Sequence, residues 1–135
     1  MIQRIQHVFL VLAVILNAAY LFSPLFERAA EDPASWIMSG ILAGVGIATL
    51  VAAVAIFMFK NRKNQMVWLR RGLIFQVLGL GFSAGVLFSM GGVSVNLIDE
   101  GLSILLPAVA FLFMVIALIY IRKDEQLVRS MDRLR

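Results

Sequence analysis

Long apolar runs divide the chain into four segments, each long enough to cross a membrane as a helix. The runs are apolar on all sides rather than along one stripe, which is typical of helices surrounded by hydrocarbon. A hydrocarbon core of about 30 Å requires roughly 20 helical residues. We therefore predict an all-α polytopic membrane protein, a four-transmembrane-helix bundle. The four helices are expected over about residues 7–26, 34–59, 72–90 and 102–121.

Helix-start and helix-end signals separate these segments. Asp32 followed by Pro33 is typical of a helix start, because Asp can cap free backbone amides and proline loses no hydrogen bond at the first helical position. A glycine pair ends the third helix, and we expect residues 93–98 to lie on the membrane or to be partly inserted. The bundle then covers residues 1–121, and residues 122–135 form a cytoplasmic helical tail. A cleaved signal peptide is the alternative for the first run.

The segment from Lys60 to Arg71, between the second and third helices, carries five basic residues and no acidic one. We expect a loop whose basic side chains contact anionic lipid headgroups, at about 1 kcal/mol each near an anionic leaflet. These side chains are Lys60, Arg62, Lys63, Arg70 and Arg71. Eleven of the twelve basic residues fall on this side of the predicted bundle. Basic residues in short loops stay on the cytoplasmic side, so this loop and both termini are predicted to be cytoplasmic.

Composition excludes several kinds of site. Hydrophobic residues make up 61% of the 135 residues and charged ones 15%, against about 45–50% and 25% in soluble domains. The net charge of +4 is explained by topology, so no nucleic acid partner is expected. The absence of cysteine excludes disulfides, iron–sulfur clusters and thiolate zinc sites. His7 is the single histidine, and we expect no metal, no cofactor and no enzymatic activity.

Small residues recur every four positions along two of the predicted helices. In a bilayer, helices associate by close packing at such residues, because lipid tails are as apolar as leucine. We expect both faces to pack inside the bundle, with an oligomer interface as the alternative. The residues are Gly40, Gly44, Ala48 and Ala52 in the second helix, and Gly81, Gly85 and Ser89 in the third.

Asn17 and Gln76 are the most notable polar side chains inside the predicted spans. A buried amide in hydrocarbon needs a hydrogen-bond partner, and such bonds between helices contribute about 1–2 kcal/mol in model peptides. We expect an interhelical structural contact. The alternative is a contact to a quinone or a lipid headgroup. No charged side chain falls clearly inside a predicted span, which argues against an ion-coupled transporter.

The tail has the pattern of an amphipathic helix. Leu127, Met131 and Leu134 fall on one helical face, while Glu125 and Arg129 form a favourable pair four residues apart. A helix this short is marginal by itself, so its apolar edge is expected to rest on another surface. Three surfaces are possible: the protein's own loop, the bilayer or a partner protein. A partner would contact Leu127, Arg129, Met131 and Leu134.

Both ends of the chain resemble a known family. The start Met1–Gln6 precedes a leucine-rich helix, and the ending combines Ile121–Glu125 with Leu127–Ser130 and Asp132–Arg135. These residues resemble the bacterial membrane family called domain of unknown function 4293. The resemblance implies four transmembrane helices and a location in the bacterial inner membrane. It supplies no catalytic residue to carry over.

Two functions are compatible with these features. The first is a non-enzymatic inner-membrane protein that serves as an accessory or assembly subunit of a larger membrane protein complex. It rests on the lack of charged groups within the spans and on the patterned tail. The alternative is a small lipid- or quinone-binding membrane protein, with Asn17 and Gln76 lining its cavity.

Overall fold

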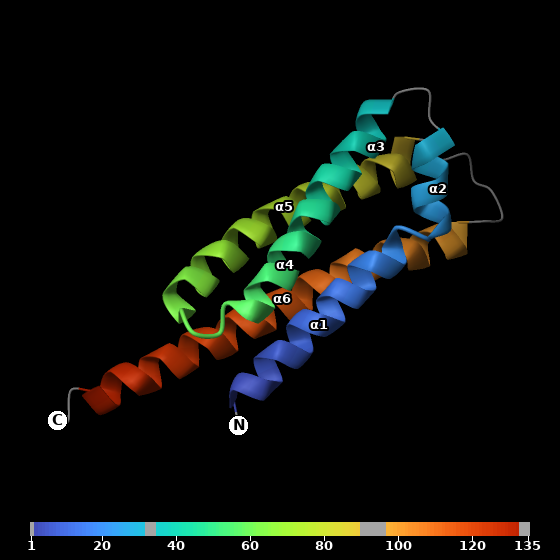
Figure 1. Cartoon of the computed structure of the whole chain (residues 1–135). Helices are drawn as coiled ribbons and strands as arrows, with labels where there is room; N and C mark the ends of the chain where they lie inside the picture. Colours follow the sequence, from blue (N-terminus) through green and yellow to red (C-terminus); the bar gives the residue numbers. More distant parts are fainter. Residues whose placement is uncertain (1, 32–34, 90–96, 133–135) are drawn as a thin grey trace.

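The structure is a computed structural model that describes residues 2–31, 35–89 and 97–132 of the chain (Figure 1). All regular structure in this part of the chain is helical, as predicted. The elements are α1 (Ile2–Tyr20), α2 (Pro24–Glu31), α3 (Ser35–Ile41), the π-helical turn η1 (Leu42–Gly46), α4 (Ile47–Phe57), α5 (Arg62–Ser89) and α6 (Leu97–Asp132).

Three helical segments are long and apolar enough to cross a membrane: Ser35–Phe57, Arg62–Phe88 and Ile98–Met131. The number reaches four when α1 and α2 are taken as one span. Ile5–Tyr20 and Pro24–Glu31 pass the same test together, but they are bent by 47° at their break. The described part of the chain is therefore helical and compatible with a membrane protein of three or four spans.

The first helix lies earlier in the chain than predicted, because it begins at Ile2 instead of about residue 7 and ends at Tyr20 instead of continuing to residue 26. Pro24 has no backbone N–H, and its ring would clash with the carbonyl four residues earlier. Ser23 begins a new helix, since its carbonyl accepts hydrogen bonds from the N–H groups of Phe26 and Glu27 at 3.0 and 3.1 Å. The sequence Ser23-Pro24 is thus a helix-start signal that our prediction missed, whereas the predicted signal at Asp32-Pro33 lies outside the described residues.

The prediction of a loop over residues 60–71 is wrong, because α5 begins at Arg62. Asn61 caps this helix: its side-chain oxygen accepts from the N–H of Asn64 at 3.3 Å, and its carbonyl accepts from the N–H of Gln65 at 2.9 Å. Residues 60–71 contain neither glycine nor proline, so nothing in this segment interrupts a helix before Gly72. A short turn after α4 therefore makes the connection, and the basic residues extend the third helix beyond the predicted 72–90.

The last helix is the longest, and α6 runs from Leu97 to Asp132. It contains the predicted helix 102–121 and continues without interruption into the tail, as expected for a helical tail. Its beginning includes Leu97 and Ile98, which were predicted to lie in a surface connection. The rest of that predicted connection lies outside the described residues.

The long helices form a bundle in which α1 packs against α6 and α4, while α5 packs against α4, η1 and α6. The helices α1 and α5 are consequently diagonal neighbours, and they run in the same direction (Figure 1). We call the end where α1 starts, α4 joins α5 and α6 finishes the basic end. The opposite end, with α2, is the acidic end, and it carries Glu27, Glu31, Asp99 and Glu100.

Candidate functional site

A reciprocal pair of amides connects α1 to α5 across the centre of the bundle. Asn17 and Gln76 are both fully buried. Asn17 Nδ2 donates to Gln76 Oε1 at 2.9 Å, and Gln76 Nε2 donates to Asn17 Oδ1 at 2.9 Å. Gln76 Nε2 also donates to the carbonyl oxygen of Pro107 in α6 at 3.0 Å. Three helices thus meet at one polar contact.

The Pro107 carbonyl determines how both amides are oriented. A carbonyl can only accept, so Gln76 must turn its NH₂ group towards Pro107, and the remaining oxygen must accept from Asn17. Gln76 therefore uses both of its N–H bonds and its oxygen within the protein. The predicted interhelical contact describes this arrangement. The alternative was that Gln76 contacts a quinone or a lipid headgroup. Both N–H bonds and the oxygen of its amide are already used within the protein.

A second polar contact joins the same two helices closer to the acidic end. The hydroxyl groups of Tyr20 and Ser83 are 2.6 Å apart, and both residues are buried. Ser83 Oγ donates its only hydrogen to the carbonyl oxygen of Gly79 at 2.8 Å, so Tyr20 must donate to Ser83. This contact was not predicted from the sequence. Tyr20 follows Asn17 by three residues and Ser83 follows Gln76 by seven, and these helical spacings place them on the amide-bearing faces.

The small residues of the second predicted helix face the inside of the bundle. A Cβ atom on Gly44 would lie 2.4 Å from the backbone N and Cα of Gly79, so the two backbones touch. A Cβ atom on Gly40 would lie 2.8 Å from the ring of Phe82. Ala48 and Ala52 are fully buried. Gly44 lies in η1, so the π-helical turn packs backbone to backbone against α5 at Gly79.

The expectation that Gly81 and Gly85 pack inside the bundle is wrong for this chain, since a Cβ atom on either would meet nothing within 4 Å. Gly81 comes two residues after Gly79, which turns it about 200° around the helix to the outer surface. The buried face of α5 follows Gly72, Gln76, Gly79 and Ser83 instead. The polar side chains of Gln76 and Ser83 distinguish this face from that of Gly81 and Gly85, which the prediction did not take into account. Ser89 is the last residue of α5, and the position of its side chain is not described by the structure.

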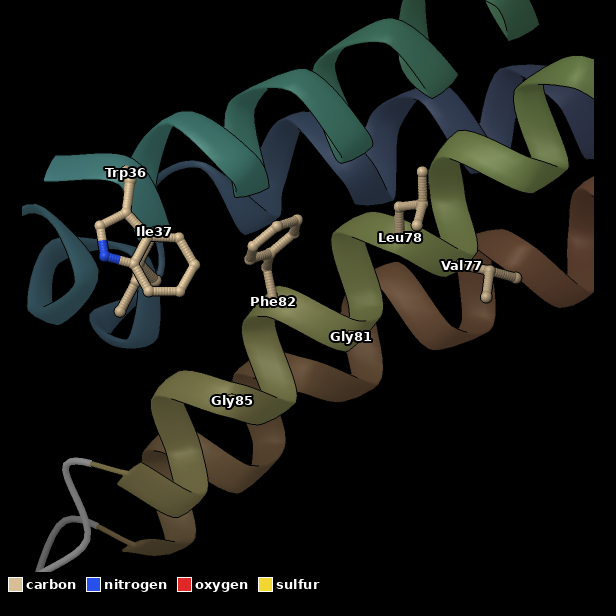
Figure 2. A pocket seen from close by; sticks show the side chains of 7 residues that line it. All are labelled: Trp36, Ile37, Val77, Leu78, Gly81, Phe82 and Gly85. Atoms are coloured by element: carbon tan, nitrogen blue, oxygen red, sulfur yellow. The ribbon is translucent and has the colours of Figure 1, made fainter. Parts of the chain in front are cut away.

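Gly81 and Gly85 form part of an apolar surface groove of about 510 Å³ between α3 and α5. Figure 2 shows Trp36 and Ile37 on α3 facing the α5 residues of this groove. The rings of Trp36 and Phe82 meet edge to face with centroids 6.0 Å apart. Val77 and Leu78 complete the lining, which is almost entirely hydrocarbon.

At the basic end, Arg62 was predicted to contact lipid headgroups, but its side chain is paired with another residue of the protein. Its Nη2 atom lies 3.1 Å from Asp124 Oδ2, and both side chains are largely buried. This ion pair ties the first turn of α5 to the base of the tail. The other four predicted headgroup ligands, Lys60, Lys63, Arg70 and Arg71, are exposed.

Lys60 and Lys63 also line a hollow between the α4–α5 turn and the tail, with a volume of about 590 Å³. Glu125 and Val128 of α6 line its other side. Neither lysine has an ion-pair partner within the described ranges. The lining of the hollow is therefore mixed: it contains the basic side chains of Lys60, Arg62 and Lys63, the acidic side chain of Glu125 and the apolar side chains of Phe59 and Val128.

The apolar edge of the tail is uncovered. Leu127 is 50% exposed and Met131 is 62% exposed. Arg129 Nε donates to Glu125 Oε1 at 3.1 Å, which is the predicted pair four residues apart. Leu134 lies outside the described residues. The protein's own loop therefore does not cover Leu127 or Met131 in the part of the chain that the structure describes.

At the acidic end, Arg28 of α2 forms an ion pair with Glu100 of α6. The buried side chains of Leu25 and Ala29 place α2 against the bundle, in one apolar cluster with Tyr20 and Ile41. No group of three His, Cys, Asp or Glu side chains suited to a metal ion occurs among the described residues.

Fold and site together define an all-helical protein of membrane-length apolar helices that are joined by polar contacts across their core. The chain belongs to the family described as domain of unknown function (DUF4293), whose model matches residues 2–134. Neither a curated protein nor a solved structure matches the chain.

Proposed function

We propose that the chain is a four-span protein of the bacterial inner membrane and a non-enzymatic accessory or assembly subunit of a larger membrane protein complex. The bent pair α1–α2 serves as the first span, and α3–α4, α5 and α6 are the others. The termini and the α4–α5 turn face the cytoplasm, because the exposed basic residues cluster there.

The observation that carries this proposal is the far end of α6. Beyond Ile121, which is fully buried, the helix leaves the bundle, and the apolar side chains of Leu127, Val128 and Met131 are exposed. Burial of such side chains is worth roughly 25 cal/mol per Å² of apolar surface. An isolated helical end of this length is marginal in water, so a partner that covers its apolar edge would stabilise it.

The charge of the tail favours a protein partner over the bilayer surface. Residues 122–135 contain five basic and three acidic residues, which leaves a net charge of +2. The four exposed basic residues of 60–71, which exclude the ion-paired Arg62, have no acidic neighbour within that segment and provide a stronger attraction to anionic headgroups. Lipid binding is therefore assigned to Lys60, Lys63, Arg70 and Arg71, and the tail is assigned to the partner.

The polar core supports a structural role for the bundle. Asn17 and Gln76 bond to each other, as do Tyr20 and Ser83, and Gln76 and Ser83 also donate to the carbonyl oxygens of Pro107 and Gly79. They hold α1 against α5, and their hydrogen-bonding groups are directed at each other. The bundle in this proposal is an anchor that positions the tail.

Cross-linking of the full-length protein in its native membrane, followed by mild solubilisation and mass spectrometry, tests the proposal. The wild-type chain should retain a stable companion protein, and the variant Leu127→Ser/Met131→Ser should lose it. The matched control is Gln126→Ala/Ser130→Ala, which changes exposed polar residues of the same helix and should keep the companion. A solitary wild-type protein, or equal retention by all three, contradicts the proposal.

A further inference from the structure

Gln6 and Gln65 are two further amides that are buried at the basic end. Gln6 is 1% exposed and Gln65 is fully buried. Gln65 Nε2 donates to the carbonyl oxygen of Ala55 at 2.7 Å, but its Oε1 atom accepts no hydrogen bond from the described residues. Both polar atoms of the Gln6 amide are likewise without a partner in that part of the chain. Such groups are rarely left unpaired in a protein interior.

The register of α1 and α5 places these two glutamines opposite each other. The bonded residues Asn17 and Gln76 are 59 positions apart in the chain. Gln6 and Gln65 are also 59 positions apart, and each lies eleven residues before its counterpart in the bonded pair. Eleven residues are slightly more than three complete helical turns, so the same face is presented again.

The residues between the two layers support this register. Leu10 and Leu69, which share the same separation, are fully buried in one apolar cluster. Ala13 and Gly72 follow with the same separation and are also buried. The α1–α5 diagonal thus carries an amide layer at Gln6, an apolar stretch, and a second amide layer at Asn17.

The unpaired polar atoms of Gln6 and Gln65 comprise one NH₂ group and two carbonyl oxygens. Asp124 Oδ2 at the same end also accepts no hydrogen bond from the described residues, but its charge is balanced by Arg62 Nη2 at 3.1 Å. An anion would face both oxygens. A cation would approach the guanidinium group of Arg62, which precedes Gln65 by three residues and lies on the same side of α5. Water both donates and accepts, so it can satisfy the NH₂ group and the oxygens together.

We propose that Gln6 and Gln65 hold buried water across the α1–α5 diagonal. This hydrated layer is the counterpart of the Asn17–Gln76 layer, in which the amides bond to each other. It extends the polar network of the basic end from the Arg62–Asp124 ion pair towards α1, and it is independent of the proposed accessory function.

Nuclear magnetic resonance of the full-length protein in lipid nanodiscs tests the proposal, with ¹⁵N in the glutamine side chains. The probe is water itself, detected by nuclear Overhauser cross-peaks to each side-chain NH₂ group. The Gln6 group should show a cross-peak to long-lived water. The Gln76 group, whose N–H bonds are both used, should show none and is the internal control.

Two substitutions sharpen the result. Gln65→Leu removes one side of the layer and should abolish the Gln6 water cross-peak, whereas Gln76→Leu should leave it unchanged. Replacement by leucine introduces no new polar group, so the Gln65 variant is expected to fold. A Gln6 group as free of water contacts as Gln76 in the wild-type protein overturns the proposal, as does a Gln6 cross-peak that persists in Gln65→Leu.

Discussion

At the scale of single residues, Gly44 and Gly79 set how closely the π-helical turn approaches α5. We expect Gly44→Ala to destabilise the protein by about 1–3 kcal/mol, because the added methyl group would meet the Gly79 backbone at 2.4 Å. Gly46→Ala is the control, since Gly46 lies in the same turn and has nothing within 4 Å of its Cβ position. Thermal unfolding in detergent measures both. Equal losses of stability would show that the two backbones are not in contact.

The amide pair makes a second prediction at this scale. Asn17→Leu or Gln76→Leu alone leaves a buried polar partner unsatisfied and should cost about 1–3 kcal/mol. The double substitution removes both partners and should cost clearly less than the sum of the two. A double-mutant cycle in chemical denaturant measures this difference. Additive effects would mean that the two amides do not depend on each other.

These contacts differ in how far the sequence could predict them. Asn17 and Gln76 stand out because an amide in a hydrophobic run requires a partner. Gly79 does not stand out, because Gly81 lies two positions away and the spacing of Gly81 and Gly85 equals that of a packing stripe. Only the polar side chains of Gln76 and Ser83 distinguish the inner face from the outer one, and they must be weighed together with the glycines.

At the scale of elements, the start of α5 is where sequence and structure differ most. We expect backbone amides from Met66 to Arg71 to exchange hydrogen roughly 100-fold more slowly than those of the turn at residues 59–60, because they are bonded within a helix. Hydrogen exchange with mass spectrometry, or with nuclear magnetic resonance, measures the ratio. Rapid hydrogen exchange at all backbone amides of residues 60–71 would show that this segment is a loop and not the start of α5.

The difference arises because a run of charged residues between two apolar segments is typical of a loop but is equally compatible with a helix. Basic residues fix the orientation of a membrane protein, but lysine and arginine are good helix formers. Helix ends are decided by local chemistry: Asn61 caps α5, and Pro24 ends α1. The apolar runs predicted the three long helical segments Ser35–Phe57, Arg62–Phe88 and Ile98–Met131, because length and hydrophobicity are properties of the sequence alone, but they did not predict the break between α1 and α2.

At the scale of the whole molecule, the proposed topology depends on whether α1 with α2 crosses the membrane. The chain has no cysteine, so single cysteines can report their side without background labelling. With four spans, an impermeant maleimide should label Asn61→Cys, Gln126→Cys and a cysteine added before Met1 from the cytoplasmic side, and Ala30→Cys from the other. If the N-terminal cysteine and Ala30→Cys are labelled from the same side, then α1 with α2 does not cross the membrane.

The ion pairs at the two ends of α6 have a further consequence for the bundle as a whole. Glu100 and Asp124 lie on one continuous helix, and twenty-four residues at 1.5 Å correspond to about 36 Å. In the proposed orientation this length exceeds the hydrocarbon core of about 30 Å by only a few ångströms. A helix fastened at both ends cannot slide along its axis relative to the bundle, so a mismatch with a thicker or thinner bilayer is relieved only when the whole bundle tilts or the bilayer deforms. The two pairs thus favour membranes of one thickness.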